Sequence, residues 1–165
     1  MSKAKFNIVG NVKLYSYPSD YTFEMIKNLS KEERELHLVD QGNNLVVDMG
    51  LAQIVNLMVG ANTSSFTYCR VGTGTSTPLA GDTDMGTILS TGVIISSRYR
   101  AGIVAYFDTF FSTTANNGTW TETGIATAST GGELLCRRKF TSSFIKAVTN
   151  TALVSWSITL AAVAD

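Results

Sequence analysis

From residue 64 to the end of the chain, short runs of β-branched and aromatic residues are separated by clusters of Gly, Asn, Thr and Ser. The last run is the clearest, because Val154, Trp156 and Ile158 are spaced by single serines. This alternation gives a strand one apolar and one polar face. Several such runs predict a mainly β domain over residues 41–165, a sandwich or barrel, with an antiparallel, jelly-roll-like sandwich as the preferred arrangement.

The run "GIVAYFDTFF" at 102–111 is apolar on both faces. A strand of this kind is covered on both sides, so we expect the core on one side and the helix or another subunit on the other.

One segment has a helical period instead. In "DMGLAQIVNLMVG" the apolar residues Leu51, Ile54, Val55 and Met58 recur at helical spacing. An aspartate at 48 stands at the N-cap position, and a glycine at 60 stands where the helix should stop. The pattern predicts one α-helix that packs its apolar stripe onto a sheet.

The segment before this helix mixes signals. We expect a short helix over 22–28, and the pair Ser30 and Glu33 has the spacing of a capping box, which favours a second helical turn. A strand is expected at 35–39. The turn-forming letters "QGNN" at 41–44 then predict a hairpin between two short apolar strands.

Charge is balanced, with 13 Lys and Arg against 13 Asp and Glu, so the sequence predicts neither a nucleic-acid nor a membrane partner. No apolar run is long enough for a membrane span or a signal peptide, which favours folding in a cytoplasm. Nearly half of the charges lie in the first 40 residues. The rest is poor in charge and rich in hydroxyls, which suits β-structure covered by neighbouring subunits.

Two cysteines, Cys69 and Cys136, are too few for a disulfide scaffold and lack the spacing of a metal site. Each lies in an expected strand, so we interpret them as small buried thiols.

The stretch "CRVGTGTSTPLAGDTDMG" at 69–86 has the glycines and hydroxyls of a phosphate-binding loop. No helix follows its glycines and no Gly-Lys-Ser/Thr motif occurs, so we interpret it as an ordered loop between strands. Asp82 and Asp84 could offer oxygens to a cation, but they are interpreted as turn-forming and capping residues.

Candidates for catalysis are few. His37 is the single histidine, without a second to serve as a base, and is interpreted as a surface or half-buried structural residue. Glu122 lies in a neutral strand, and Arg137, Arg138 and Lys139 are its candidate partners on another strand. No second carboxylate is nominated across a cleft. The sequence therefore predicts no enzyme and no catalytic, cofactor-binding or metal-binding residue.

An aromatic set near the N-terminus has two open interpretations, a binding surface for a glycan or partner and packing onto the domain or a neighbour. Its members are Tyr15, Tyr17, Tyr21 and Phe23.

Taken in order, several phrases over residues 43–161 resemble a recurrent module of tailed-bacteriophage virion proteins. They are "VVDMGLAQIVNLMVG", "FTYCRVGTGTSTPLAGDTDM", "GTWTETGIAT", "GGELLCRRKF" and "LVSWSITL". The resemblance implies a compact β-sandwich that assembles as a homo-oligomer, with the loop at 72–86 joining two strands. It also implies that Glu122 and Gly124 mark a strand-edge turn and that the last strand closes the sheet.

The function so implied is a structural component of the virion, such as a tail-fibre, baseplate or collar subunit, assembled in the host cytoplasm. Its expected partners are itself, with a trimer favoured, and other virion proteins. Residues 1–40 lie outside the module and are expected to form an arm that docks on a neighbour. The alternatives are a capsid-decoration or head-fibre protein and a module that binds a host receptor or surface glycan.

Overall fold

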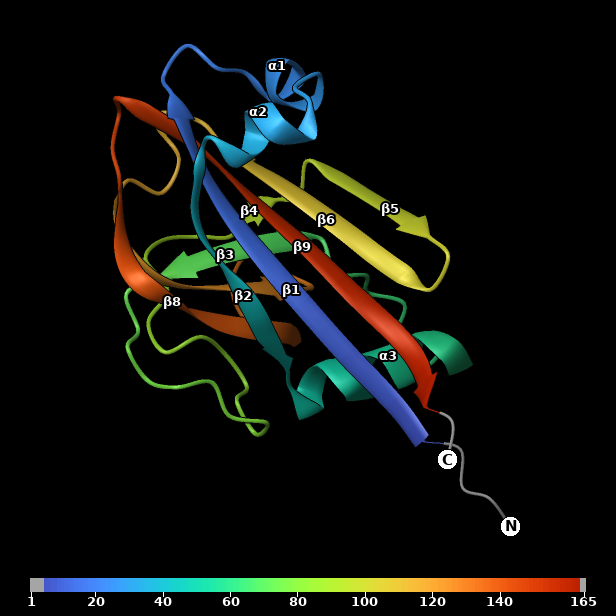
Figure 1. The fold of residues 1–165 in the computed structure, drawn as a ribbon. Coiled ribbons are helices and arrows are strands. Elements are labelled where there is room, and N and C mark those ends of the chain that lie inside the picture. The colour runs from blue at the N-terminus through green and yellow to red at the C-terminus, as the bar shows by residue number, and fades with distance from the viewer. Residues whose placement is uncertain (1–4, 164–165) are drawn as a thin grey trace.

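The computed structural model describes residues 5–163, which form a mainly β fold with few helices, as the sequence predicts. Nine antiparallel strands make one sheet that is curled into a half-barrel (Figure 1), in the order β4-β3-β7-β8-β2-β1-β9-β6-β5. The strands are β1 (Lys5–Pro18), β2 (Leu38–Val46), β3 (Tyr68–Gly72), β4 (Val93–Ile94), β5 (Ser97–Ala101), β6 (Val104–Phe111), β7 (Gly118–Ala126), β8 (Leu134–Lys146) and β9 (Asn150–Val163).

The curl places two halves of the sheet opposite each other around the main core. Val12, Val154 and Trp156 come from one half, and Trp120 and Ile125 come from the other. The alternation expected in β9 is confirmed, since Val154, Trp156 and Ile158 are all buried. Their burial, with that of the other core residues, stabilises the curled sheet through the hydrophobic effect.

Strand β1 occupies the middle of this sheet instead of forming an arm. It pairs with β9 from Lys5–Val163 to Pro18–Asn150, and its other edge pairs with β2. Its alternation of polar residues with Val12 and Leu14 explains this position, because one of its faces is buried in the core. The last strand β9, expected to close the sheet, likewise lies inside it, between β1 and β6.

Two short helices, α1 (Phe23–Lys27) and α2 (Lys31–Glu35), cover part of the outer face of the sheet at one end (Figure 1). The expected capping box is confirmed, since Ser30 and Glu33 exchange both hydrogen bonds. The expected strand at 35–39 begins only at Leu38. Phe23 of α1 contacts Phe110 of β6 with ring centroids 6.1 Å apart, so this end of β6 is covered on both faces.

The hairpin expected at 41–44 is wrong, because β2 runs through these residues as one strand. Residues 40–44 pair with β1, and Leu45 and Val46 pair with β8. The glycine at 42 serves a close approach and not a turn: the guanidinium of Arg138 occupies the space that a Cβ would need there.

The expected helix is confirmed as α3 (Asp48–Val59) and ends at Gly60, whose φ of 69° is left-handed. Val47, one residue earlier than expected, is the N-cap and makes no side-chain capping bond. The helix packs on β8 through Gly50, where the Leu135 backbone leaves no room for a Cβ. Its fully buried residues are Gly50 and Gln53. Of the apolar stripe, Ile54 is partly buried against the main core and the other members are exposed, so the predicted packing is confirmed for Ile54 alone.

Candidate functional site

The long loop over 73–92 joins β3 to β4, as expected for a connection between strands, and it folds back over the sheet. Its anchor is Glu122, a fully buried carboxylate in the middle of β7. The loop amides of Gly74 and Thr87 donate to Oε1 over 2.9 and 2.8 Å, and that of Gly86 donates to Oε2 over 3.1 Å. The loop therefore does cradle an anion, and the anion is the protein's own carboxylate.

The glycines of this loop are explained by the same contact. A Cβ on Gly74 would overlap the Glu122 carboxylate, and one on Gly86 would lie 2.9 Å from the Arg137 guanidinium. Only a backbone without side chains can approach the carboxylate this closely. Gly124, expected at a strand-edge turn with Glu122, also lies inside β7, where it pairs with β3 and β8.

Arg137 completes the anchor. Its Nε donates to Oε2 of Glu122 over 2.7 Å, its Nη1 donates to Asp82 over 2.8 Å, and its Nη2 donates to the Ser76 hydroxyl over 2.9 Å. The expected pairing of Glu122 with a basic residue of β8 is thereby confirmed for Arg137. Asp82 also accepts the amide of Leu79 over 3.0 Å, as a turn-forming aspartate does. Burial opposes ionisation of Asp82, but the Leu79 amide and Arg137 outweigh it and lower its pKa.

A second buried arginine, Arg70 of β3, holds the far part of the loop. It donates to Asp84 over 2.8 Å and to the carbonyls of Ala128 and Gly131. The two aspartates of the loop therefore pair with different arginines. Sequence reasoning missed Arg70, although a single charged residue inside the apolar run "FTYCRVG" was a signal for a buried ion pair.

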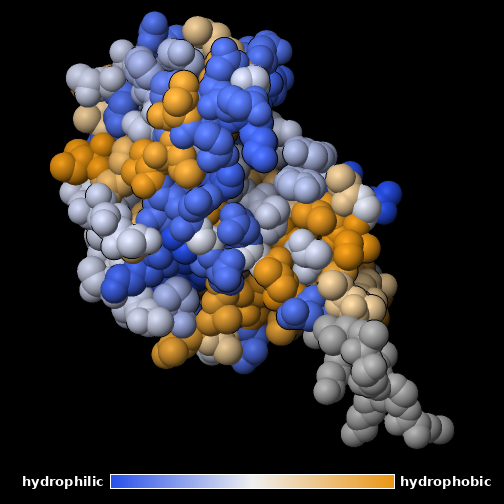
Figure 2. All heavy atoms as spheres, in the orientation of Figure 1, coloured by the Kyte–Doolittle hydropathy of each residue, from blue (hydrophilic) through white to orange (hydrophobic). Residues whose placement is uncertain are grey.

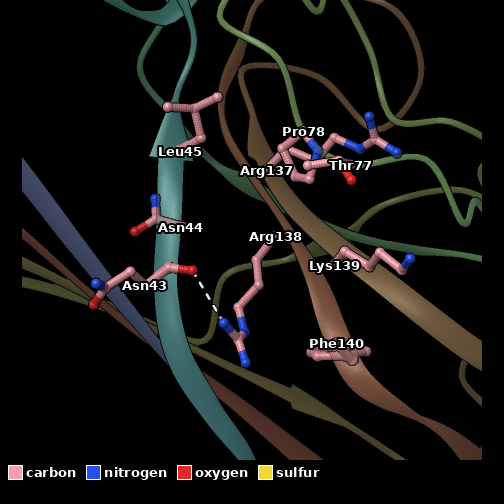
Figure 3. A pocket seen from close by; sticks show the side chains of 9 residues that line it. All are labelled: Asn43, Asn44, Leu45, Thr77, Pro78, Arg137, Arg138, Lys139 and Phe140. Carbon is pink, nitrogen blue, oxygen red and sulfur yellow. Dashed lines mark hydrogen bonds between the residues drawn. The ribbon is translucent and has the colours of Figure 1, made fainter.

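The three consecutive basic residues of β8 line a shallow hollow of about 400 Å³, where Arg137 and Lys139 extend to one side of the strand and Arg138 extends toward β2 (Figure 3). Arg137 reaches under the loop, while Arg138 turns to β2, where it donates to the carbonyl of Asn43 over 3.0 Å and pairs with Asp40. Lys139 alone is exposed. Because their charges do not converge, these side chains do not form one anion-binding cluster.

The cysteines are free and fully buried, as interpreted. Burial raises the pKa of the Cys69 thiol to about 11 and raises that of Cys136 further. Both thiols therefore stay protonated at neutral pH, which makes them poor nucleophiles.

His37 is half-buried in the turn before β2 rather than within the strand. Its Nδ1 lies 3.2 Å from the carbonyl oxygen of Ser16, and its ring lies 4.4 Å from that of Tyr17. Tyr15 and Tyr17 are buried, and Tyr21 and Phe23 pack against them. Of the two interpretations of the aromatic set, the structure shows packing onto the domain.

An apolar groove of about 690 Å³ lies between α3 and the inner face of the sheet, at the end where β1 begins and β9 ends. The stripe of α3 forms one wall, and residues of β1, β9 and the β5–β6 turn form the other; the most important are Leu51, Val55, Met58, Ile8, Ile103 and Leu160. Met58 is 80% exposed, Ile103 60% and Val55 56%. Figure 2 shows hydrophobic side chains gathered around this region.

Within residues 5–163 no helix is long and apolar enough to cross a bilayer, and no group of three or more His, Cys, Asp and Glu side chains is arranged to hold a metal ion. No known protein family, curated protein or solved structure matches the chain significantly.

Proposed function

We propose that this protein is a non-enzymatic structural subunit of a tailed-bacteriophage virion, for example of a tail fibre, baseplate or collar, and that it acts by homo-oligomeric assembly. The proposal combines the sequence resemblance with one observation, the open apolar groove beside α3. In this proposal the two facing halves of the sheet act as a sandwich of the jelly-roll-like kind, to which neighbouring copies and other virion proteins attach.

The groove supports assembly because it exposes large apolar side chains next to one another. Val55, Met58 and Ile103 would all remain in contact with water in an isolated copy. A contiguous apolar patch of this kind marks an interaction site on a soluble protein. Covering it with a second copy yields about 25 cal/mol per Å² of apolar surface before the ordering costs of association.

The buried charge network supports a scaffold role for the same subunit. The Glu122 carboxylate is fully buried beneath the loop over 73–92. It accepts four hydrogen bonds, three from loop amides and one from Arg137, and these hold the loop to the sheet. A carboxylate committed in this way fixes the shape of a surface loop and has no oxygen directed at a substrate.

Oligomeric state in solution tests the proposal. We expect the purified protein to form a homo-oligomer, with a trimer favoured, in native mass spectrometry at micromolar concentration. Val55→Asp and Met58→Asp should each shift it to monomer, because a charge would be buried in the contact. The matched control is Val148→Asp, also exposed (63%) but in the β8–β9 turn at the opposite end of the sheet, which should leave assembly unchanged.

A wild-type protein that stays monomeric, or an oligomer equally insensitive to all three substitutions, would overturn the assembly mechanism. The virion assignment has its own test, which is detection of the protein among the components of purified phage particles. Immunogold labelling of those particles separates a tail or baseplate position from the alternative of a capsid-decoration or head-fibre protein.

A further inference from the structure

The outer face of the sheet carries a set of hydrogen-bonding side chains that the proposed assembly does not use. Residues paired across an antiparallel ladder share a face, and the inward neighbours Val12 and Trp156 show which face is outside. The pairing of β1, β9, β6 and β5 places two rows side by side on that outer face. One row is Asn11, Ser157, Tyr106 and Tyr99, and the other is Lys13, Ser155, Asp108 and Ser97.

The rows form a trough. Ser155 and Ser157 of β9 are short, and they lie between the taller Tyr106 and Asp108 of β6 and the side chains of β1. The hollow above them measures about 180 Å³. It adjoins a larger one of about 640 Å³ beneath α2, because Lys13 and Tyr106 line both. Together they make an open, elongated site that suits a chain of rings better than a compact molecule.

Aromatic rings stand at one side of this trough. Tyr99 and Tyr106 are stacked, with ring centroids 4.8 Å apart and an angle of 11° between their planes. Since Tyr99 covers one face of Tyr106 from β5, the other face of Tyr106 borders the trough above β9. An aromatic face next to hydroxyl groups presents an apolar surface and polar partners at the same time.

The charges of the site are nearly balanced, because Lys13, Lys31 and Arg34 line it together with the carboxylates of Glu35 and Asp108. Lys13 Nζ lies 2.5 Å from Glu35 Oε1, so the ammonium is already paired. Asp108 lines the smaller hollow and takes part in none of the salt bridges among the described residues. A carboxylate without a cationic partner repels an anionic ligand and accepts hydrogen bonds from a neutral one.

We propose that this face binds a neutral oligosaccharide. The apolar C–H face of a pyranose ring stacks on Tyr106, and its hydroxyl groups meet the serines, Asn11 and Asp108, which together supply both donors and acceptors. The two hollows are lined largely by hydroxyl, amide and charged groups, whereas the centre of a protein–protein contact is usually apolar. Of the aromatic set near the N-terminus only Tyr15 reaches this site, where it lines the larger hollow, and Tyr17, Tyr21 and Phe23 pack elsewhere in the fold.

The oligosaccharide site and the assembly groove lie on opposite faces of the sheet, so the two proposals fail separately. Ile8 and Leu160, which line the groove, belong to the inner-facing set, whereas Asn11 and Ser157 belong to the outer-facing set. Loss of sugar binding would leave assembly intact, and a monomeric protein could still bind sugar.

Saturation-transfer NMR with defined sugars tests the site. The probes are the neutral hexasaccharides of maltose, cellobiose, chitin and β-mannan type, with hexagalacturonate as the anionic probe. We expect saturation transfer to the ring protons of at least one neutral probe and none to hexagalacturonate. Tyr106→Ala should weaken the binding at least about tenfold, because the stacking surface is removed.

Ser157→Gln provides a second variant that removes no packing contact and fills the trough, and it should also weaken binding about tenfold. Its matched control is Ser142→Gln on an exposed position of β8, which should bind like wild type. Thermal unfolding of each variant shows whether it is folded. The proposal is overturned if no neutral probe binds, if only the anionic probe binds, or if Ser157→Gln binds as tightly as wild type.

Discussion

At the scale of single residues, the chain binds one of its own anions with the groups that other proteins direct at phosphate. Glu122 lies under the loop and accepts three loop amides and the Nε of Arg137. A buried carboxylate without such partners would be strongly destabilising. Neither Glu122 nor Arg137 could stay buried without the other, and the hydrogen bonds to Glu122 fix the geometry of the loop.

Replacing Glu122 with glutamine tests this dependence. Glu122→Gln keeps the shape but removes the charge, and its amide group must face either loop amides or Arg137, all of which are donors. We expect the free energy of unfolding to fall by about 3–5 kcal/mol in urea titrations. The control Glu24→Gln removes an exposed carboxylate that is paired with Lys27, and it should change the free energy of unfolding by less than about 0.5 kcal/mol. Equal effects would contradict the anchoring role.

At the scale of elements, α3 shows how much the sequence could predict. Its period, its end at Gly60 and its type are local properties, and all were predictable. Which of its faces becomes buried was not predictable, because that depends on Leu135 of β8, which lies far from Gly50 in the chain. The backbone of Leu135 selects Gly50 as the contact and leaves Val55 and Met58 beside the groove. The hairpin predicted from "QGNN" at 41–44 was wrong for the same reason. Gly42 is needed there to make room for the Arg138 guanidinium, which comes from a distant part of the chain, and not to form a turn.

The packing of α3 reverses a familiar effect of glycine. Gly→Ala inside a helix normally stabilises by about 1 kcal/mol. At Gly50 the added Cβ would overlap the Leu135 carbonyl, so Gly50→Ala should lower the free energy of unfolding by about 1–3 kcal/mol. Chemical denaturation measures this change. Gly81→Ala is the control, because nothing lies within 4 Å of its Cβ, and stabilisation by Gly50→Ala would mean that α3 does not pack on β8 in this way.

At the scale of the whole molecule, backbone pairing joins strands that are distant in the chain, and apolar side chains fill most of the interior that these strands enclose. The alternation in the last strand predicted the buried position of Trp156, and the apolar surroundings predicted buried thiols. The central place of β1 was not predictable, because its partner β9 lies at the other end of the chain. The outer-face trough was likewise hidden, since only strand register brings Asn11, Ser157 and Tyr106 together.

Alkaline pH should unfold the molecule through its buried hydroxyls and thiols. Burial raises the pKa of Tyr15 and of Tyr17 from 10.0 to about 12, and that of Cys69 from 9.0 to about 11. The unfolded chain therefore releases these protons at lower pH than the folded chain. The contribution of these groups to the free energy of unfolding is therefore complete below their pKa values in the unfolded chain. It is lost as the pH rises toward and through their pKa values in the folded chain, and the loss is about 1.4 kcal/mol per tyrosine at pH 11.

Urea titrations at pH 8.5 and pH 11 measure this loss, and the double substitution Tyr15→Phe/Tyr17→Phe separates the tyrosines from the thiol. Phenylalanine carries no proton to lose, so the variant should retain more of its pH 8.5 stability at pH 11 than wild type retains. The remaining decline should then begin near the lower pKa of the unfolded cysteine. An identical decline in the variant and in wild type would show that ionisation of the two tyrosines does not limit stability in alkali.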